Sequence, residues 1–497
     1  MFQGSKAIKE RNYEEFPFDV EGIEYVILTH AHIDHSGLIP KLIKKGFKGN
    51  IIATLPTVDF CSIMLPDSGY IQEMEVERKN KKNKRAGIPL IEPIYTSNDA
   101  HAAMTYFRGV DYDLKTSLTN DITIRFRNSG HIMGSAIVEL WIEERGKQTK
   151  LVFSGDLGNF NQPIIKDPET ITEADYLIVE STYGDRIRGV QNDTKGELER
   201  IIRETKERGG NLIIPSFAIE RTQDLLYDLN LLKREGKLPD IDIFVDSPLA
   251  ISATEIFCKN VQYFDERTKE LYEEKGRCPL FIDNLIFTRT TEESKALNER
   301  KKPAIIISAS GMCDAGRIKH HLKHNLWRNE STILFVGYQA EGTLGRKILD
   351  GAKKVRIHGE EIAVSAKIEK IEGYSGHADL NGLLNWVRKF DEQLLKAIFI
   401  VHGEANSMEN FKMEMEKSIK NAKIEIPEYK EVYILKEEEI VEKTIEKKEE
   451  FSKGIVQDKF KDVLESLLDE YNSKLDEKKY KEIMEKLQAI DSVIKGK

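Results

Sequence analysis

Three histidines and an aspartate stand within six residues near the start of the chain. They follow the apolar run Tyr25–Leu28, which predicts a buried strand, and they are His30, His32, Asp34 and His35. Side chains at this spacing cannot all face one way on a strand or a helix, so we expect a turn on which they converge. Neutral imidazole with carboxylate suits zinc, and four such groups are enough to begin two metal positions. Solvated loop histidines would not explain this density.

Other potential ligands occupy the same kind of place further along the chain. One alternating strand ends just before His131, a second before Asp156, and a third at Glu180. A lone His131 would more often be structural, and a lone Asp156 more often a turn residue. Because sites in α/β layers form at the carboxyl ends of strands, their shared placement favours a common site.

Length and composition limit the class of protein. A chain of 497 residues should hold two or three domains, and 40% apolar residues are typical of a globular enzyme. No apolar run approaches the ~18 residues that a membrane span needs, and no signal peptide is visible, so we expect no membrane association. The four cysteines are scattered without CxxC spacing, which predicts neither a disulfide framework nor a zinc finger and fits a reducing cytoplasm.

The net charge of −9 argues against a protein that grips nucleic acid by bulk positive charge. It leaves room for a nuclease whose metals and a local groove supply positive potential. The densest basic run follows a long predicted helix and spans Glu77–Arg85. It can be a solvated helix face or a contact with a phosphate backbone.

The motifs together resemble a known family. The stretch His30–His35, followed by His131 and Asp156, is similar to the dinuclear metal set of the metallo-β-lactamase fold. Three more stretches resemble the β-CASP nucleases within that superfamily, and the subgroup is that of bacterial and archaeal ribonucleases related to the cleavage-and-polyadenylation endonuclease. These stretches are Glu180–Gly184, Ser375–Asp379 and Val401–Glu404.

The resemblance implies an α/β architecture, a metallo-β-lactamase αββα sandwich with an inserted β-CASP domain. The sandwich would comprise 1–185 and 350–435, and the insertion 186–349. Short apolar strands alternating with helices independently predict a parallel α/β domain within 186–349. From 436 to 497 the chain becomes rich in Lys and Glu, and apolar residues recur at helical spacing. This predicts a charged helical extension that either packs on the core or pairs with a second copy as a homodimer.

The resemblance also implies a division of two zinc ions among these residues. His30, His32 and His131 would bind one ion, and Asp34, His35 and His402 the other, with Asp156 bridging. Glu180 and His377 would flank the site and support protonation of the leaving oxygen, with Asp34 counted among the catalytic residues as well. The alternative for Glu180 is that it only orients a ligand histidine. Hydrolysis would leave a 5′-phosphate and a 3′-hydroxyl.

Three strand-to-turn segments of the inserted region offer backbone amides and arginines to phosphates. Each alone is a weak signal, but three in one domain suggest a groove that follows an RNA backbone, as in the family. Phe217 and Tyr338 are candidates for base stacking, although packing is the more ordinary role. The residues assigned to RNA binding are Ser216, Arg221, Ser310, Gly311, Arg317, Thr343 and Arg346.

Several functions compete. The first is a zinc-dependent ribonuclease of RNA processing or decay, acting on single-stranded RNA and resembling endonucleases more than 5′-exonucleases. The second is a DNA-directed relative, but those tend to have an aliphatic residue where this chain has His402. The third is a scaffold paralogue without catalysis, which would lose ligands, whereas all seven are present. A small-molecule hydrolase would not need the insertion.

The start of the chain departs from the family. Relatives carry roughly thirty more residues before Met1, including strands and an aspartate that buttresses the metal loop. We therefore expect an N-terminally incomplete core and a start assigned too late, because losing central strands would leave sheet backbone unsatisfied.

Overall fold

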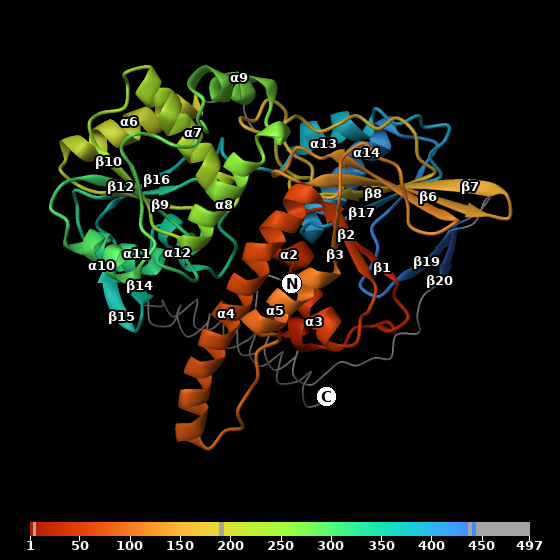
Figure 1. Ribbon diagram of the computed structural model, residues 1–497, viewed down its shortest axis with the longest axis horizontal. Coiled ribbons are helices and arrows are strands. Elements are labelled where there is room, and N and C mark those ends of the chain that lie inside the picture. Colours follow the sequence, from red (N-terminus) through yellow and green to blue (C-terminus); the bar gives the residue numbers. More distant parts are fainter. Residues whose placement is uncertain (3–5, 188–192, 436–439, 444–497) are drawn as a thin grey trace, which may run out of the picture. The chain divides into compact units, whose positions relative to one another are not determined.

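The computed structural model describes the chain except for residues 3–5, 188–192, 436–439 and 444–497 (Figure 1). It divides into two compact units. The first comprises Met1–Ser5 and Asn12–Pro427, and the second Lys6–Arg11 and Glu428–Lys497. Within the described residues, no helix is both long and apolar enough to cross a lipid bilayer.

The larger sheet of the first unit places three strand ends side by side. Its order is β18-β17-β8-β7-β6-β5-β4, with β7, β8, β17 and β18 parallel and the rest antiparallel. The register aligns Phe153 with Ile178, and Glu180 with Val401, so the residues that follow these strands meet at one edge. The strands are β4 (Thr116–Ser117), β5 (Ile122–Asn128), β6 (Ala136–Glu144), β7 (Lys147–Phe153), β8 (Tyr176–Glu180), β17 (Ala397–Val401) and β18 (Lys423–Glu425).

A smaller parallel sheet carries the histidine-rich loop. It consists of β1 (Tyr25–Ile27), β2 (Asn50–Thr54) and β3 (Phe107–Val110) in that order. The elements connected to it are η1 (Arg11–Tyr13), α2 (Ile33–Ser36), α3 (Ile39–Lys44), α4 (Leu55–Ala86), α5 (Ser97–Ala103) and η2 (Met104–Tyr106).

The two sheets pack face to face, with helices outside. Ile52 and Phe126 share an apolar core between the sheets. The outer face of the large sheet, with Val152 and Ile400, packs on α13 (Leu380–Val387) and α14 (Ala405–Ser418). The outer face of the small sheet packs on α3, α4 and α5. The predicted αββα sandwich is confirmed.

The inserted region forms an all-parallel sheet of its own in the order β11-β10-β12-β9-β13-β16. Its strands are β9 (Leu212–Pro215), β10 (Asp242–Val245), β11 (Leu285–Phe287), β12 (Ala304–Ser308), β13 (Thr332–Phe335) and β16 (Lys367–Lys370). Its helices are α6 (Thr194–Glu207), α7 (Arg221–Arg234), α8 (Pro248–Lys259), η3 (Val261–Tyr263), α9 (Glu266–Lys275), α10 (Thr291–Glu299), α11 (Ile318–Asn325) and α12 (Leu344–Leu349).

Strands beyond the predicted end of the insertion pack in its core and join its sheet. The hairpin of β14 (Lys354–Ile357) and β15 (Glu360–Ala363) packs in the core of the inserted domain, and β16 pairs with β13. Sheet membership therefore carries the inserted domain to Lys370, about twenty residues beyond the predicted boundary at 349/350. Sequence alternation reveals strands, but it does not tell which sheet a strand joins.

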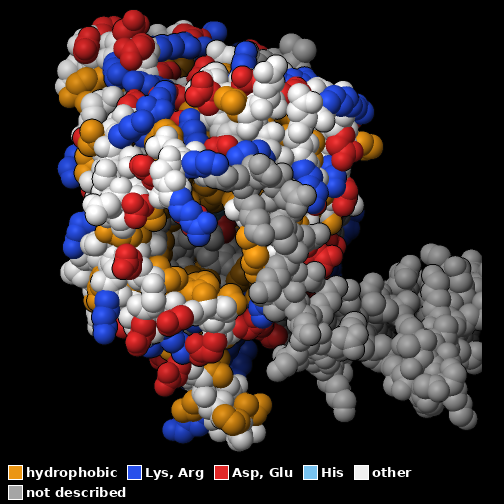
Figure 2. Space-filling model, turned by 90° about the vertical axis from the view of Figure 1, so that its right-hand side faces the viewer, with side chains coloured by type: hydrophobic (Ala, Val, Ile, Leu, Met, Phe, Trp, Pro, Cys, Tyr) orange, Lys and Arg blue, Asp and Glu red, His pale blue; other side chains and the backbone are white. Residues whose placement is uncertain are grey.

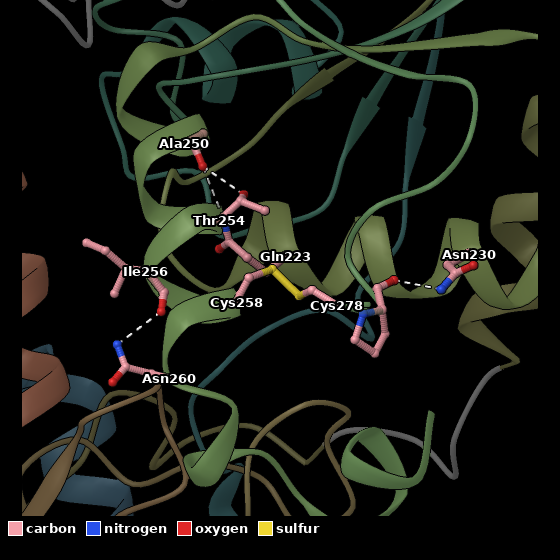
Figure 3. Close-up of a disulfide and its surroundings, with 9 residues drawn as sticks. Gln223, Asn230, Ala250, Thr254, Ile256, Cys258, Asn260 and Cys278 are labelled. Carbon is pink, nitrogen blue, oxygen red and sulfur yellow. Dashed lines mark hydrogen bonds between the residues drawn. A yellow bond between two sulfur atoms is a disulfide. The ribbon is translucent and has the colours of Figure 1, made fainter. Parts of the chain in front are cut away.

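The prediction about the cysteines is wrong for one pair. Cys258, near the end of α8, forms a disulfide with Cys278, which lies 20 residues later (Figure 3). A search for local CxxC spacing misses such a pair, because the fold and not the spacing brings the two thiols together. Cys61 and Cys313 are buried free thiols. The disulfide removes the cysteine-based argument for a reducing compartment.

In the second unit, part of the C-terminal extension is strand where we expected helix. Ile440–Lys443 (β20) pairs antiparallel with Val432–Leu435 (β19). The unit also contains α1 (Lys6–Glu10). The rest of the predicted helical extension, 444–497, lies outside the described residues.

A buried carboxylate anchors the strand ends of the inserted domain. Asp246 follows β10 and accepts hydrogen bonds from Thr288 and Ser294 at 2.6 Å each. Arg317 Nη1 lies 2.7 Å from Oδ1, and His321 Nε2 lies 2.6 Å from Oδ2. Although burial opposes this, these partners hold the pKa of Asp246 well below its ordinary value. Charge and hydrogen bonding thus favour the ionised form in the fold.

We expect Asp246→Asn to lower the free energy of unfolding by about 3 kcal/mol near neutral pH, as for other broken buried ion pairs. Folding depresses the pKa of Asp246. The stability that its ionised carboxylate contributes is therefore present above about pH 4, the ordinary pKa of an aspartate, and is lost as the pH falls below that value. Denaturant unfolding at neutral and acid pH measures this. A stability difference that does not shrink in acid would contradict the assignment.

Candidate metal centre and active site

The histidine-rich loop is held by its own hydrogen bonds. Leu28 N donates to Ile52 O at 2.9 Å, which extends the pairing of β1 to the edge of the loop. The chain then leaves the sheet and enters the single helical turn of α2. Ser36 Oγ donates to Ala31 O at 2.8 Å and to His32 O at 3.0 Å, which closes the loop on itself. These bonds give the convergent turn that the sequence predicts.

The first ligand group consists of His30, His32, His131 and Asp156, whose ligand atoms all lie within 4.8 Å of one another. His32 Nδ1 lies 3.1 Å from both His30 Nε2 and His131 Nε2. Asp156 Oδ2 lies 3.4 Å from His30 Nε2 and 3.5 Å from His131 Nε2. His32 is half-buried and the other three are buried.

The second group consists of Asp34, His35 and His402 and is more open to solvent. The Nε2 atoms of His35 and His402 are 3.1 Å apart, and Asp34 Oδ2 lies 3.7 Å from His402 Nε2. Asp156 reaches this group as well, because its Oδ1 lies 3.4 Å from His35 Nε2 and 3.6 Å from His402 Nδ1. One carboxylate therefore turns one oxygen to each group.

The protonation of the first group suits a cation. Burial lowers the pKa of His32 to about 4, and burial also lowers the pKa values of His30 and His131. Neutral imidazoles are the form that binds metal. Asp156 Oδ1 is buried without a hydrogen-bond partner among the described residues. An oxygen that faces imidazole nitrogens without a hydrogen bond is suited to a metal ion, because a buried charge is costly unless its partners are held in place. The residues fit a metal centre.

His402 is held differently from the buried histidines. It has φ of 53° just after β17, and its Nδ1 lies 3.1 Å from Thr182 Oγ1. Burial lowers its pKa, but the charges of Asp156 and Asp34 outweigh burial and raise the pKa to about 10. A cation at this position would replace the proton and satisfy the same two carboxylates.

Glu180 and His377 form a separate pair beside the cluster. Glu180 is buried; its Oε1 accepts from Leu157 N at 2.6 Å and its Oε2 from Thr182 N at 3.1 Å. Its Oε1 also lies 3.2 Å from His377 Nδ1. Burial opposes protonation, but the charge and hydrogen bond of Glu180 raise the pKa of His377. His377 Nε2 lies 4.0 Å from Asp156 Oδ2, so the ring's other nitrogen faces the cluster.

The three strand-end turns of the inserted domain lie next to one another. Added side-chain atoms at Gly311 or Gly337 would contact the ring of Phe217, so that ring lies across both turns. Gln339 Nε2 donates to Gly311 O at 2.9 Å. Ser310 Oγ lies 3.3 Å from Ala315 O inside its own turn, and Thr343 caps α12. Arg346 is exposed and pairs with Asp350.

Three of the residues assigned to RNA binding are instead engaged by other groups of the protein. Arg221 is buried, with Nη1 2.6 Å from Asp224 Oδ2, which corrects the prediction that it faces a phosphate. Ser216 is buried and accepts from Thr222. Arg317 is engaged by Asp246 and two backbone carbonyls. Sequence alone does not reveal this, because an arginine after a strand looks the same whether it faces solvent or an internal carboxylate.

One residue at the mouth of the site, Arg186, was not singled out from the sequence. The Arg186 guanidinium lies 5.3 Å from the ring centre of Tyr183 and 5.6 Å from that of Tyr338. Tyr338 donates its hydroxyl to Glu404 at 3.1 Å, two residues after His402. The position of Arg186 just beyond the predicted strand end at Glu180 is the only signal that could have found it.

Known protein families match this chain in three successive parts. Residues 4–111 match the metallo-β-lactamase superfamily, 222–348 the β-CASP domain, and 361–427 the Zn-dependent metallo-hydrolase RNA specificity domain. Each matched part contains or borders residues of the site. This combination and the cluster geometry show a metal-binding hydrolase site.

Curated relatives align over most of the chain. Ribonuclease TTHA0252 of Thermus thermophilus is 35% identical over 82% of this chain and 87% of the relative. An RNase J-like protein of Methanocaldococcus jannaschii is 33% identical over 81% and 86%. Transcription termination factor FttA of the same archaeon is 31% identical over 79% of this chain, which spans only 60% of that protein's length.

We expect the ligand groups to lose metal separately. His32→Ala removes a ligand from the first group and His402→Ala from the second, so each should lower the bound metal per chain only in part. Asp156→Asn should lower it most, because its carboxylate faces both groups. Elemental analysis of purified protein measures this, with exposed His324→Ala as a control. Wild-type metal content in all three variants would refute the ligand set.

Proposed function

Because this chain belongs to the β-CASP family of the metallo-β-lactamase superfamily, we propose that it is a zinc-dependent ribonuclease. The observation that carries the proposal is Asp156, which faces two ligand groups at the edge where the strand ends of the sandwich meet. The relatives named as ribonucleases and the RNA specificity domain support RNA as the substrate.

The site would hold two zinc ions. His30, His32 and His131 would bind one ion, and Asp34, His35 and His402 the other, while Asp156 would contribute one oxygen to each. Histidine nitrogens and carboxylate oxygens are ordinary zinc ligands. When bound, two such ions supply Lewis acidity that activates water at neutral pH and offsets the charge developing on a phosphodiester.

The protein's own acid would be His377. Its Nδ1 is fixed by Glu180, whose two oxygens are in turn fixed by backbone amides. The raised pKa of His377 keeps a proton available on the ring. Its Nε2, which faces the cluster, is the atom that would give that proton to the leaving 3′-oxygen. The hydrogen bond to His377 favours this role for Glu180 over the orientation of a ligand histidine.

The RNA would enter past the turns of the inserted domain. Phe217 and Tyr338 are among the exposed large side chains, and Arg186 lies over Tyr338. Exposed rings beside a guanidinium are suited to unstacked bases. Single-stranded RNA is therefore the expected substrate. We propose endonucleolytic cleavage, with 5′-exonucleolytic cleavage as the alternative outcome.

Turnover of matched single-stranded RNA and DNA tests the substrate. We expect RNA cleavage at internal positions that is abolished by a chelator and is the same for 5′-hydroxyl and 5′-phosphate forms. Products would carry 5′-phosphate and 3′-hydroxyl ends. Preferred cleavage of DNA would favour a DNA-directed nuclease, and absence of cleavage by metal-loaded protein would favour a scaffold.

We expect His377→Ala to lower kcat by about 10²- to 10⁴-fold, the usual contribution of a general acid. Because His377 belongs to neither ligand group, bound metal should stay at the wild-type level. Single-turnover cleavage and elemental analysis measure the two quantities. His324→Ala, an exposed histidine on α11, is the control. A full cleavage rate with full metal content would exclude the acid role.

A further inference from the structure

The C-terminal half of α4 forms an arm that stands clear of the body (Figure 1, Figure 2). Its first half is anchored, since Asp59 accepts from Asn260 at 3.1 Å and lies 3.6 Å from Lys259 at the end of α8. From Glu77 onward, almost every side chain of α4 is exposed. The arm comprises Glu77–Ile91, which is the end of α4 and the segment that follows it.

One side of the arm is covered by its own returning segment. Asn80 donates to Ile91 O at 2.8 Å and accepts from Ile91 N at 2.9 Å. Asn83 donates to Pro89 O at 3.1 Å. Val76, one turn before Asn80 on the same side, is buried. The opposite side of the helix therefore remains free.

That free side carries three of the cations, and Lys79 and Lys84 flank it. Arg78, Lys82 and Arg85 follow one another at spacings of four and three residues, which places them on one face about 5–6 Å apart. Among the described residues none of the three has an ion-pair partner, whereas Lys81 pairs with Glu77. Closer to the body on the same helix, Tyr70 is 57% exposed.

Two ordinary explanations do not account for this face. Cations stabilise the end of a helix through its dipole, but this effect is limited to the last turn and so does not extend to Arg78 and Lys82. A solvated helix face usually mixes charges, as on α6, where Arg200 pairs with Glu204 and Arg203 with Glu199. The arm has six cations and one carboxylate between Glu77 and Ala86.

The inserted domain presents further cations near Arg78. The rings of His320 and His358 stack with centroids 4.5 Å apart. Burial lowers the pKa of His358, and the charges of Lys319, Lys323 and Arg78 lower it further. The arm therefore lies within electrostatic reach of the β14–β15 turn. Glu360, beside that turn, pairs with Lys323 and does not neutralise Lys319 or Arg78.

We propose that the cationic face of the arm, Arg78, Lys82 and Arg85, binds the backbone of single-stranded RNA outside the cleavage site. This rests on RNA being the substrate. Positive charges at short intervals on one helix face, with an exposed tyrosine further along the same helix, are suited to binding single strands. The arm gives longer RNAs an additional contact that shorter ones do not reach.

The test compares two double variants of one helix. R78Q/K82Q removes two charges from the proposed face, and K79Q/K84Q removes two from its flanks. We expect R78Q/K82Q to raise KM about tenfold for long RNAs and to lower the salt slope of log(kcat/KM) by about 1.4, two phosphate contacts at about 0.7 each. It should leave kcat, and KM for short RNAs, unchanged. K79Q/K84Q should resemble wild type throughout.

Equal effects of the two variants at every RNA length would overturn the proposal. So would a change of sedimentation in R78Q/K82Q without a change in KM, which would make the arm a contact between copies of the chain. The same two double variants are also made in a His377→Ala background, and their Kd for RNA is measured by fluorescence anisotropy. This keeps the test independent of cleavage. If wild type does not cleave RNA, the proposed function fails, while the length dependence of Kd still decides the role of the arm.

Discussion

The structure depends on one buried carboxylate that must face two groups of ligands at once. Asp156 lies between imidazoles that come from the loop after β1, the turn after β5 and the end of β17. A charge at such a depth is costly unless its partners are held in place. The register of the large sheet supplies this constraint, because Phe153 aligns with Ile178 and Glu180 with Val401, so the residues that follow these strands share one edge. A one-residue slip of any of these strands would turn its residues to the other face of the sheet.

The inserted domain braces this arrangement from its helix α7. Glu220, buried at a φ of 69°, accepts from Met133 N at 3.0 Å, two residues beyond His131. Asp228 accepts from the hydroxyl of Tyr374 at 2.7 Å, three residues before His377. Glu220 at the start of α7 thus holds the loop that carries the metal-ligand residue His131. Asp228 within the same helix holds the loop that carries the proposed acid His377. The domain proposed to supply the nucleic-acid surface therefore also restrains the position of the site histidines.

Local patterns predicted most elements, and tertiary contacts decided the rest. Apolar strands followed by histidine or aspartate are encoded within a few residues, so the convergence of His30, His131 and Asp156 could be expected from the sequence alone. The pairing of β16 with β13, the burial of Arg221 and the Cys258–Cys278 disulfide could not, because each depends on a partner that is remote in sequence or on a buried acid. The same limit applies to His321, whose contact with the buried Asp246 joins residues 75 positions apart.

An acidic chain that acts on a polyanion must concentrate its positive charge. A net charge of −9 disfavours binding of a polyanion by the chain as a whole, and Arg186 and the free face of the arm are places where we propose local attraction. Salt-dependent, non-specific binding grows with the number of phosphates a protein neutralises. Restricting such cations to a few places would lower the number of orientations in which a strand is held. On this argument the acidity of the chain contributes to selectivity.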